Sequence, residues 1–145
     1  MQIQRAVLFT AILLAAAGVA SAQQAPLPRT AAPEGAAAYI ISPKDGATVS
    51  SPVTVVFGLA GMGVAPAGVA LPNTGHHHLI IDAALPELTL PIPTDENHRH
   101  FGGGQTEVKV SLPPGQHTLQ LVLGDQNHVP HTNPIVSEKI TITVE

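Results

Sequence analysis

The stretch HTLQLVLGD, residues 117–125, decides the fold class, because its leucines fall at every second position. Alternate side chains of an extended strand point to opposite faces, so Leu119, Leu121 and Leu123 line one face. The segment EVKVSL, residues 107–112, repeats this period, with apolar residues inward and polar residues outward. An amphipathic helix would instead need apolar residues at intervals of three and four. These segments therefore predict β-strands.

Other segments carry the same period between turns that are rich in proline and glycine. They are AYIISPKDGATV (38–49), PVTVVFGL (52–59) and KITITVE (139–145). Short alternating strands without an amphipathic helix predict an all-β fold, an antiparallel β-sandwich of immunoglobulin or fibronectin-III type. The chain has no cysteine and no tryptophan, so it lacks the Cys-Trp-Cys pin of antibody domains. The prediction therefore concerns architecture and leaves strand order open.

Residues 1–22 have the features of a secretory signal peptide. Arg5 lies in a short polar start, an apolar run follows, and Ala20-Ser21-Ala22 matches an A-x-A cleavage site. We expect cleavage after Ala22 and a periplasmic or secreted protein. The apolar run is too short to cross a bilayer, so no membrane-spanning segment is expected.

The segment after the predicted leader, residues 23–37, is rich in proline, alanine and glutamine and has no strand or helix period. We expect a disordered tether there, followed by one sandwich domain over residues 38–145. The chain has 6 basic and 10 acidic residues and a formal net charge of −4. This balance argues against a nucleic-acid partner, which usually requires a basic surface.

Eight histidines in 145 residues are the main candidates for function. Three of them stand in GHHHLIID, residues 75–82, where strand alternation places two on one side and the third on the other. The others include an H-x-H pair and an H-V-P-H pair, both near long loops rich in glycine and proline. The candidate metal ligands are His76, His78, His98, His100, His128 and His131.

Imidazole nitrogens suit copper(II) and zinc, and H-x-H on an extended backbone offers two of them to one ion. Met62 is the only methionine after the predicted leader, which argues against a methionine-rich copper(I) site. The alternative is that the histidines make structural hydrogen bonds. We expect this for His117, which starts a strand on the face of its leucines.

Acidic residues beside the histidines have two possible roles. A carboxylate next to a ligand histidine commonly fixes its tautomer, a role open to Asp82 and Glu107. Asp95, Glu96 and Asp125 lie in segments typical of turns, where carboxylates accept hydrogen bonds from backbone amides. For these three residues we expect the turn role.

The ordered series GHHHLIID, HRHFGGGQTE, LPPGQHTLQLVLGDQNHVPH and a closing ITITV strand resembles the exported bacterial family called domain of unknown function 4399. The resemblance covers roughly residues 50–145. It implies export and a small β domain, and it brings no established activity and no agreed ligand. The chain is also loosely similar to periplasmic copper-resistance domains and to copper-zinc superoxide dismutase. Neither signature matches residue by residue, so these two comparisons rest on fold analogy.

Three hypotheses of different classes follow from these observations. The preferred one is a non-enzymatic exported domain that holds copper(II) or zinc through some of the candidate histidines. The second is a metal-dependent hydrolase or redox enzyme, which needs an open coordination position and a base such as Asp82 or Glu107. The third is an interaction module of the cell envelope with an unknown protein partner. Its paired histidines would pack loops or sense pH, with loop order lost below about pH 6.5.

Overall fold

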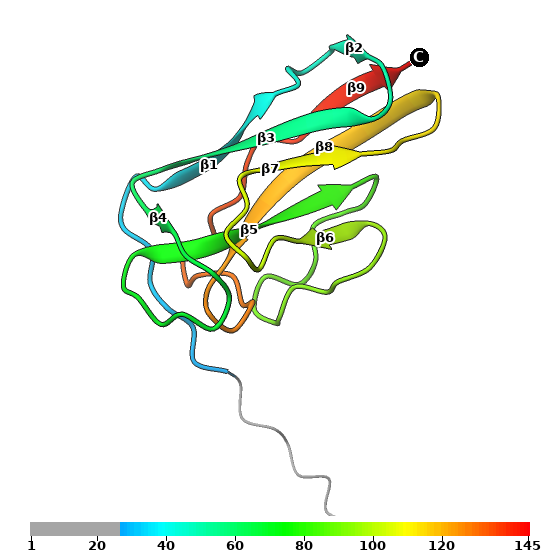
Figure 1. The fold of residues 1–145 in the computed structure, drawn as a ribbon. Coiled ribbons are helices and arrows are strands. Elements are labelled where there is room, and N and C mark those ends of the chain that lie inside the picture. Colours follow the sequence, from blue (N-terminus) through cyan, green and yellow to red (C-terminus); the bar gives the residue numbers. More distant parts are fainter. Residues whose placement is uncertain (1–26) are drawn as a thin grey trace, which may run out of the picture.

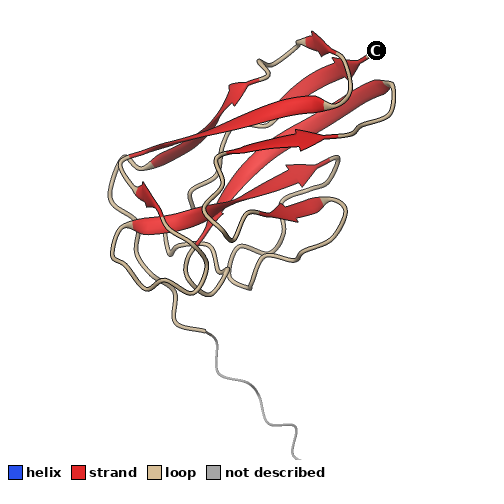
Figure 2. Cartoon of the chain, in the orientation of Figure 1, coloured by secondary structure: helices blue, strands red, loops and turns tan. Residues whose placement is uncertain are grey.

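The computed structural model of the protein describes residues 27–145, and all regular elements in that range are β-strands (Figure 1, Figure 2). The predicted signal peptide and the first residues of the predicted tether lie outside the described residues. No helix within the described range is long and apolar enough to cross a membrane. The strands are β1 (Ala37–Ser42), β2 (Thr48–Val49), β3 (Val53–Ala60), β4 (Gly63–Val64), β5 (Thr74–Ile81), β6 (His98–His100), β7 (Glu107–Val110), β8 (Gly115–Gly124) and β9 (Ile140–Val144).

The strands form two sheets. One has the order β1-β3-β7, and the other has the order β2-β9-β8-β5-β4, with β6 also paired to β5. The long strands pair antiparallel with one another, as the period of two and the turns predict. The all-β class is therefore confirmed for residues 27–145.

Two short pairs depart from the predicted antiparallel arrangement. β2 runs parallel to β9, and β4 runs parallel to β5. β2 and β9 are separated by most of the chain, and residues 65–73 lead from β4 back to the start of β5. Neither pair is joined by a tight hairpin, so no turn forces the two strands to run in opposite directions.

Apolar residues from both sheets make one core between them. Val55 and Phe57 of β3 contribute from the first sheet, and Leu79, Leu121 and Ile142 contribute from the second. These side chains are at most 3% exposed. In β3, β8 and β9 they occupy the alternate positions that the sequence predicts for one face, whereas the sequence leaves the inward face of β5 open.

The second sheet also buries its outward face. A smaller apolar cluster forms there from Ile80 of β5, Val122 of β8 and Ile92 of the long loop before β6. The loops that cover this face explain why GHHHLIID is apolar at consecutive positions, since β5 is buried on both sides. The three histidines of residues 76–78 are divided between these two environments.

The described part of the predicted tether is held against the domain. Thr132 donates its backbone N–H to the carbonyl of Thr30 at 2.9 Å, and Arg29 donates from its side chain to the carbonyl of Pro130 at 2.9 Å. Residues 27–36 contain no strand, in keeping with their composition. They nevertheless make specific contacts with the loop that follows β8, which a free tether would not make.

Candidate metal centre

The outward face of the second sheet brings histidines from two strands together. In β5, His76 and His78 point away from the sandwich core, as strand alternation predicts for positions two apart. His78 pairs directly with His100 of β6, and His76 pairs with Gly124 of β8. His128 enters from the loop that follows β8. We call these four histidines the histidine cluster.

The four rings are in mutual contact. The Nε2 atoms of His76 and His78 are 3.1 Å apart. The ring centroid of His100 lies 5.0 Å from the centroids of both His76 and His78. His128 lies 4.7 Å from His100 and 5.1 Å from His76, also measured between ring centroids. Residues more than 50 positions apart in the sequence thus converge on one small volume.

These spacings fit a single small cation. Two nitrogens bound to zinc or copper at about 2.05 Å lie about 2.9 Å apart at a right angle and about 3.3 Å apart at the tetrahedral angle. The 3.1 Å between His76 and His78 falls between these values. One nitrogen from each of His76, His100 and His128 lies within 4.8 Å of the other two. Closing that separation to about 3.3 Å needs an approach of about 1.5 Å at most.

Several nitrogens of the cluster have no hydrogen-bond partner among residues 27–145. They are Nδ1 of His76, Nδ1 of His78 and Nε2 of His100, and all three are buried. A buried polar atom without a partner typically costs about 1–3 kcal/mol. Buried polar atoms are normally satisfied, so these three nitrogens are available to a ligand. His77 and His131 also have such atoms, and the cluster differs from them in the proximity of its rings.

Burial favours the neutral form of three rings in the cluster. Burial, with smaller contributions from the neighbouring His100 and His128, lowers the pKa of His76 to about 4, while the negative charge of Asp125 opposes the shift. Burial and the same neighbours lower the pKa of His78 still more, and burial also lowers the pKa of His100. At neutral pH these rings carry no proton charge, so their lone pairs are free to bind a cation.

Two glycines leave room for the rings. A Cβ on Gly124 would lie 3.0 Å from Nε2 of His78 and 3.3 Å from the Cα of His128. A Cβ on Gly102 would lie 2.3 Å from the Cε1 of His100. A side chain at Gly102 would force the His100 ring to move, and one at Gly124 would require the His78 ring or the His128 backbone to give by a few tenths of an ångström, so both glycines have a steric role.

The turn that carries His128 is held by a buried carboxylate. Asp125 accepts hydrogen bonds at Oδ1 from the backbone N–H groups of Asn127, at 2.8 Å, and of Val129, at 3.1 Å. His128 has a φ of 65°, which is uncommon for a residue other than glycine. Its own N–H donates to the carbonyl of Asp125, and its carbonyl accepts from Ile92. The turn role expected for Asp125 is confirmed by these contacts.

The remaining histidine of the triple run faces the other way. His77 points into the sandwich core, where its ring centroid lies 5.2 Å from that of Phe57. It is fully buried, and neither ring nitrogen has a hydrogen-bond partner within residues 27–145. Burial lowers the pKa of His77 to about 4. No other histidine joins it in the aromatic contacts of the core, so it is placed apart from the cluster.

The structure leaves two of the six candidate ligands outside the cluster. His98 lies opposite Ile80 in the sheet, and its Nδ1 is 2.8 Å from Oδ1 of Asp95. His131 is buried, with its Nε2 3.3 Å from the carbonyl oxygen of Thr74. Each of these two rings contacts an acceptor away from the cluster, and Nδ1 of His131 has no hydrogen-bond partner within residues 27–145.

His117 has partners at both ring nitrogens, as expected for a structural residue. Its Nδ1 lies 2.6 Å from Oδ2 of Asp82, and its Nε2 lies 2.9 Å from the carbonyl oxygen of Pro113. Asp82 also accepts the backbone N–H of Thr118 at 2.7 Å. The carboxylate considered as a catalytic base is therefore engaged with His117. Glu107, the other acid considered, lies on β7 of the opposite sheet.

The turn role is also confirmed for Asp95. Its Oδ1 accepts hydrogen bonds from the backbone N–H groups of Asn97, at 2.8 Å, and His98, at 2.9 Å. The hydrogen bond with the His98 ring is the main cause that holds the pKa of the Asp95 carboxyl below its usual value, and the two backbone bonds add to it. The carboxylate thus fixes His98 at the start of β6.

The chain belongs to the family described as domain of unknown function (DUF4399), whose model matches residues 55–145. The matched range contains all eight histidines, and it begins after β1 and β2. No curated protein and no solved structure matches the chain. The family resemblance expected from the ordered histidine motifs is therefore confirmed, and it supplies no ligand or activity.

Proposed function

We propose that this member of the family binds one copper(II) or zinc ion in the histidine cluster and acts as a non-enzymatic metal-binding domain. The observation that carries the proposal is the convergence of imidazoles: His76, His100 and His128 offer nitrogens within 4.8 Å of one another, and Nε2 of His78 lies 3.1 Å from Nε2 of His76. An all-imidazole ligand set suits both metals, and nitrogen sites bind copper(II) more tightly than zinc. The candidate ligands are His76, His78, His100 and His128.

The location of the cluster supports reversible binding of an ion. His76 and His78 are fully buried, whereas His100 and His128 are half-buried at the solvent side of the cluster. An ion can therefore reach the buried pair past two rings that lie near the surface. The lowered pKa values of His76, His78 and His100 reduce competition from protons at pH 7.

The proposal is tested by titrating metal-free protein with copper(II) and with zinc in a calorimeter. We expect one ion per chain for the wild-type protein. In the double variant with His76→Ala and His78→Ala, affinity falls by at least about a hundredfold, because a ligand matters more than the outer contacts that cost 10–100-fold. Far-ultraviolet circular dichroism checks that each variant is folded.

The neighbouring residue provides a matched control for this titration. His77 lies between the two substituted positions but faces the sandwich core, so His77→Leu keeps wild-type affinity. Undiminished uptake by the double variant would rule out the histidine cluster as the binding site. If His77→Leu lost binding and the double variant did not, the ion would lie on the inward face of β5 and not in the histidine cluster.

We also propose that the protein is exported and that the metal is handled outside the cytoplasm. The support is the leader-like sequence of residues 1–22 with its A-x-A site. Mass spectrometry of protein secreted or released from the periplasm should give a chain that begins at Gln23. We further propose a protein partner in the cell envelope, which cross-linking in intact cells would test.

We also propose that the two sheets are related as in an immunoglobulin-type sandwich, which experimental structure determination would test.

A further inference from the structure

A short segment before β1 lies across the loop that carries His128. We call residues 29–33 the strap and residues 125–133 the clamped loop. Arg29 donates from Nε to the carbonyl of Pro130 at 2.9 Å and from Nη2 to the carbonyl of His131. One guanidinium thus holds two successive carbonyls, a fork geometry that a single lysine nitrogen cannot reproduce.

The strap and the clamped loop are also joined further along. The backbone N–H of Ala32 donates to Oδ1 of Asn133, and Nδ2 of Asn133 donates to the carbonyl of Ala32, both at 2.9 Å. Thr132 donates its backbone N–H to the carbonyl of Thr30 at 2.9 Å. The side-chain hydroxyl of Thr30 lies 3.4 Å from Oδ2 of Asp125. These contacts run from the far end of the loop back to the carboxylate that shapes the His128 turn.

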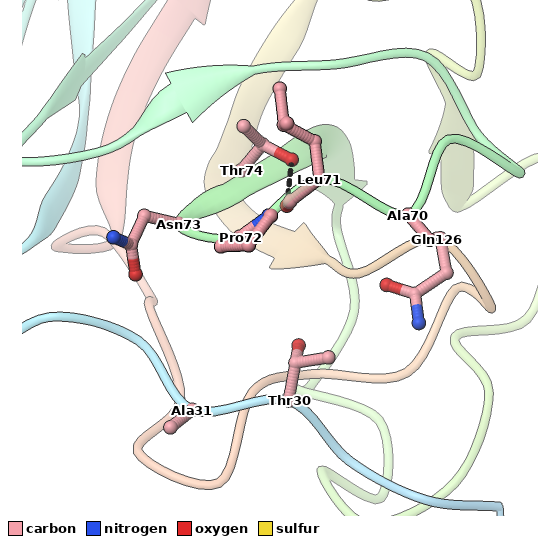
Figure 3. Close-up of a pocket in the computed structure, with 8 residues that line it drawn as sticks. All are labelled: Thr30, Ala31, Ala70, Leu71, Pro72, Asn73, Thr74 and Gln126. Carbon is pink, nitrogen blue, oxygen red and sulfur yellow. Dashed lines mark hydrogen bonds between the residues drawn. The ribbon is translucent and has the colours of Figure 1, made fainter.

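The strap is held by hydrogen bonds and by the packing of Ala32 against the main apolar core. A cavity of about 360 Å³ lies between it and the loop before β5, as Figure 3 shows, with Thr30 and Ala31 on one side and Leu71 and Pro72 on the other. The strap joins β1 through a turn at Gly35, whose φ is 77°. A segment with few buried apolar contacts and a glycine at its base can open without unfolding the sheets.

We propose that the strap positions the metal site by ordering the clamped loop, with Arg29 as the main positioning residue. This inference rests on the proposed function of the histidine cluster. The closed strap stabilises the left-handed turn that places His128 beside His76 and His100. Because coupling between two sites is reciprocal, an ion that binds His128 favours the closed strap by the same factor. The strap lies outside the matched family range of 55–145.

Trypsin reports the opening of the strap directly, because it cleaves after Arg29 only when that side chain leaves the two carbonyls. Cleavage after Lys44, which is exposed on the turn between β1 and β2, is the internal control. Saturating zinc should slow cleavage after Arg29 by about tenfold, the factor expected for a coupling of this kind. Cleavage after Lys44 should change by less than about twofold, which also controls for any effect of zinc on trypsin itself.

Variants at Arg29 test the reverse direction. Arg29→Ala should weaken zinc and copper(II) binding by about tenfold, since two net hydrogen bonds are lost. Arg29→Lys, which keeps one donor, should recover part of the affinity. The electron paramagnetic resonance spectrum of bound copper(II) should change in Arg29→Ala and return toward the wild-type spectrum in Arg29→Lys. A purely structural contact would lower the melting temperature without altering this spectrum.

The outcomes separate the two proposals. If the wild-type protein binds one ion, and Arg29→Ala binds it with equal affinity and an unchanged spectrum, the strap has no positioning role. Equal cleavage after Arg29 with and without bound zinc overturns the coupling in the same way. If the wild-type protein binds no ion, the proposed function fails, and the strap proposal fails with it.

Discussion

The two faces of β5 use adjacent histidines in different ways. His77 packs into the sandwich core against Phe57, whereas His76 and His78 meet the imidazoles of β6 and of the clamped loop. All three are fully buried, and burial lowers the pKa of each. The buried state therefore does not distinguish a ligand from a core residue. The distinguishing feature is the presence of other lone pairs at ligand distance.

Partnered histidines occur on both faces and complete the comparison. On the inward side of β8, His117 has Asp82 and the carbonyl of Pro113 at its two nitrogens. On the outward side, His98 has Asp95 at Nδ1. A ring whose nitrogens bond to protein atoms stabilises its own turn or strand end. The histidine cluster differs because its rings lie against one another, with Nε2 of His76 3.1 Å from Nε2 of His78.

The strongest test of this comparison is acid stability in His77→Leu. The pKa of His77 is about 4 in the folded protein and about 6.5 when unfolded. The unfolded state therefore binds a proton first, and the free energy of unfolding decreases as pH falls from 6.5 to 4, by about 3 kcal/mol for one such group. His77→Leu should lose less stability on acidification, as measured by urea unfolding at pH 7 and pH 4.5. An equal loss in both proteins would show that His77 is not buried neutral.

Substitution of Gly124 tests the outward face by steric means. The added methyl group of Gly124→Ala would meet the His78 ring and the His128 backbone, at 3.0 Å and 3.3 Å. We expect stability to fall by about 1–3 kcal/mol and metal affinity to fall by about tenfold. Gly63→Ala is the matched control, because its Cβ would lie at 3.4 Å from the nearest atom, an ordinary contact. Similar effects from the two variants would argue against a special role for Gly124.

The pair of His117 and Asp82 should show the opposite pH dependence from His77. The hydrogen bond to Asp82 raises the pKa of His117 above its usual value. Its stabilising contribution is therefore fully present below about pH 6.5 and is lost as pH rises through the folded pKa. His117→Gln should destabilise the protein more at pH 6 than at pH 8.5, by thermal unfolding. If the loss of stability in His117→Gln grew with increasing pH, a protonated His117 paired with Asp82 would be contradicted.

The smallest expected effect concerns His98. This residue shares the outward face and the H-x-H motif with His100, but its ring bonds to Asp95. His98→Gln should leave zinc and copper(II) affinity within about twofold of wild type, by calorimetric titration. A decrease comparable to that of the His76 and His78 double variant would extend the site to His98 and would remove the distinction between partnered and unpartnered rings.

The sequence was sufficient to predict the long strands and their main inward faces, except in β5, but not the short strands β4 and β6, which lie in segments rich in glycine and proline. In β8 and β3, alternation places Leu121 and Val55 in the core, as predicted, because turns and period agree there. It was not sufficient for β5, whose residues are apolar on both faces. The choice between them depends on the register with β6 and β8 and on the loops that cover Ile80. Such pairings join distant segments and leave no local signal.

The candidate site was predictable only in part for the same reason. Alternation placed His76 and His78 on one side, and the H-x-H motif suggested His98 and His100 as a pair. In the folded chain His98 bonds to Asp95, whereas His100 joins the cluster, and this difference depends on where Asp95 lies. No periodicity marks the meeting of His128 with β5, since loop closure is set by tertiary contacts. Arg29 lay in a proline-rich stretch whose composition resembles that of a flexible segment, which obscured its role.

The central claim is that one ion binds between the rings of the histidine cluster on the outward face of β5. Anomalous X-ray diffraction at the zinc and copper absorption edges, on crystals of metal-loaded protein, tests it directly. The account predicts a single anomalous peak within about 2.0–2.3 Å of nitrogens from at least three of His76, His78, His100 and His128. A peak located instead at His98, His131 or His77, or no peak at full loading, would contradict it.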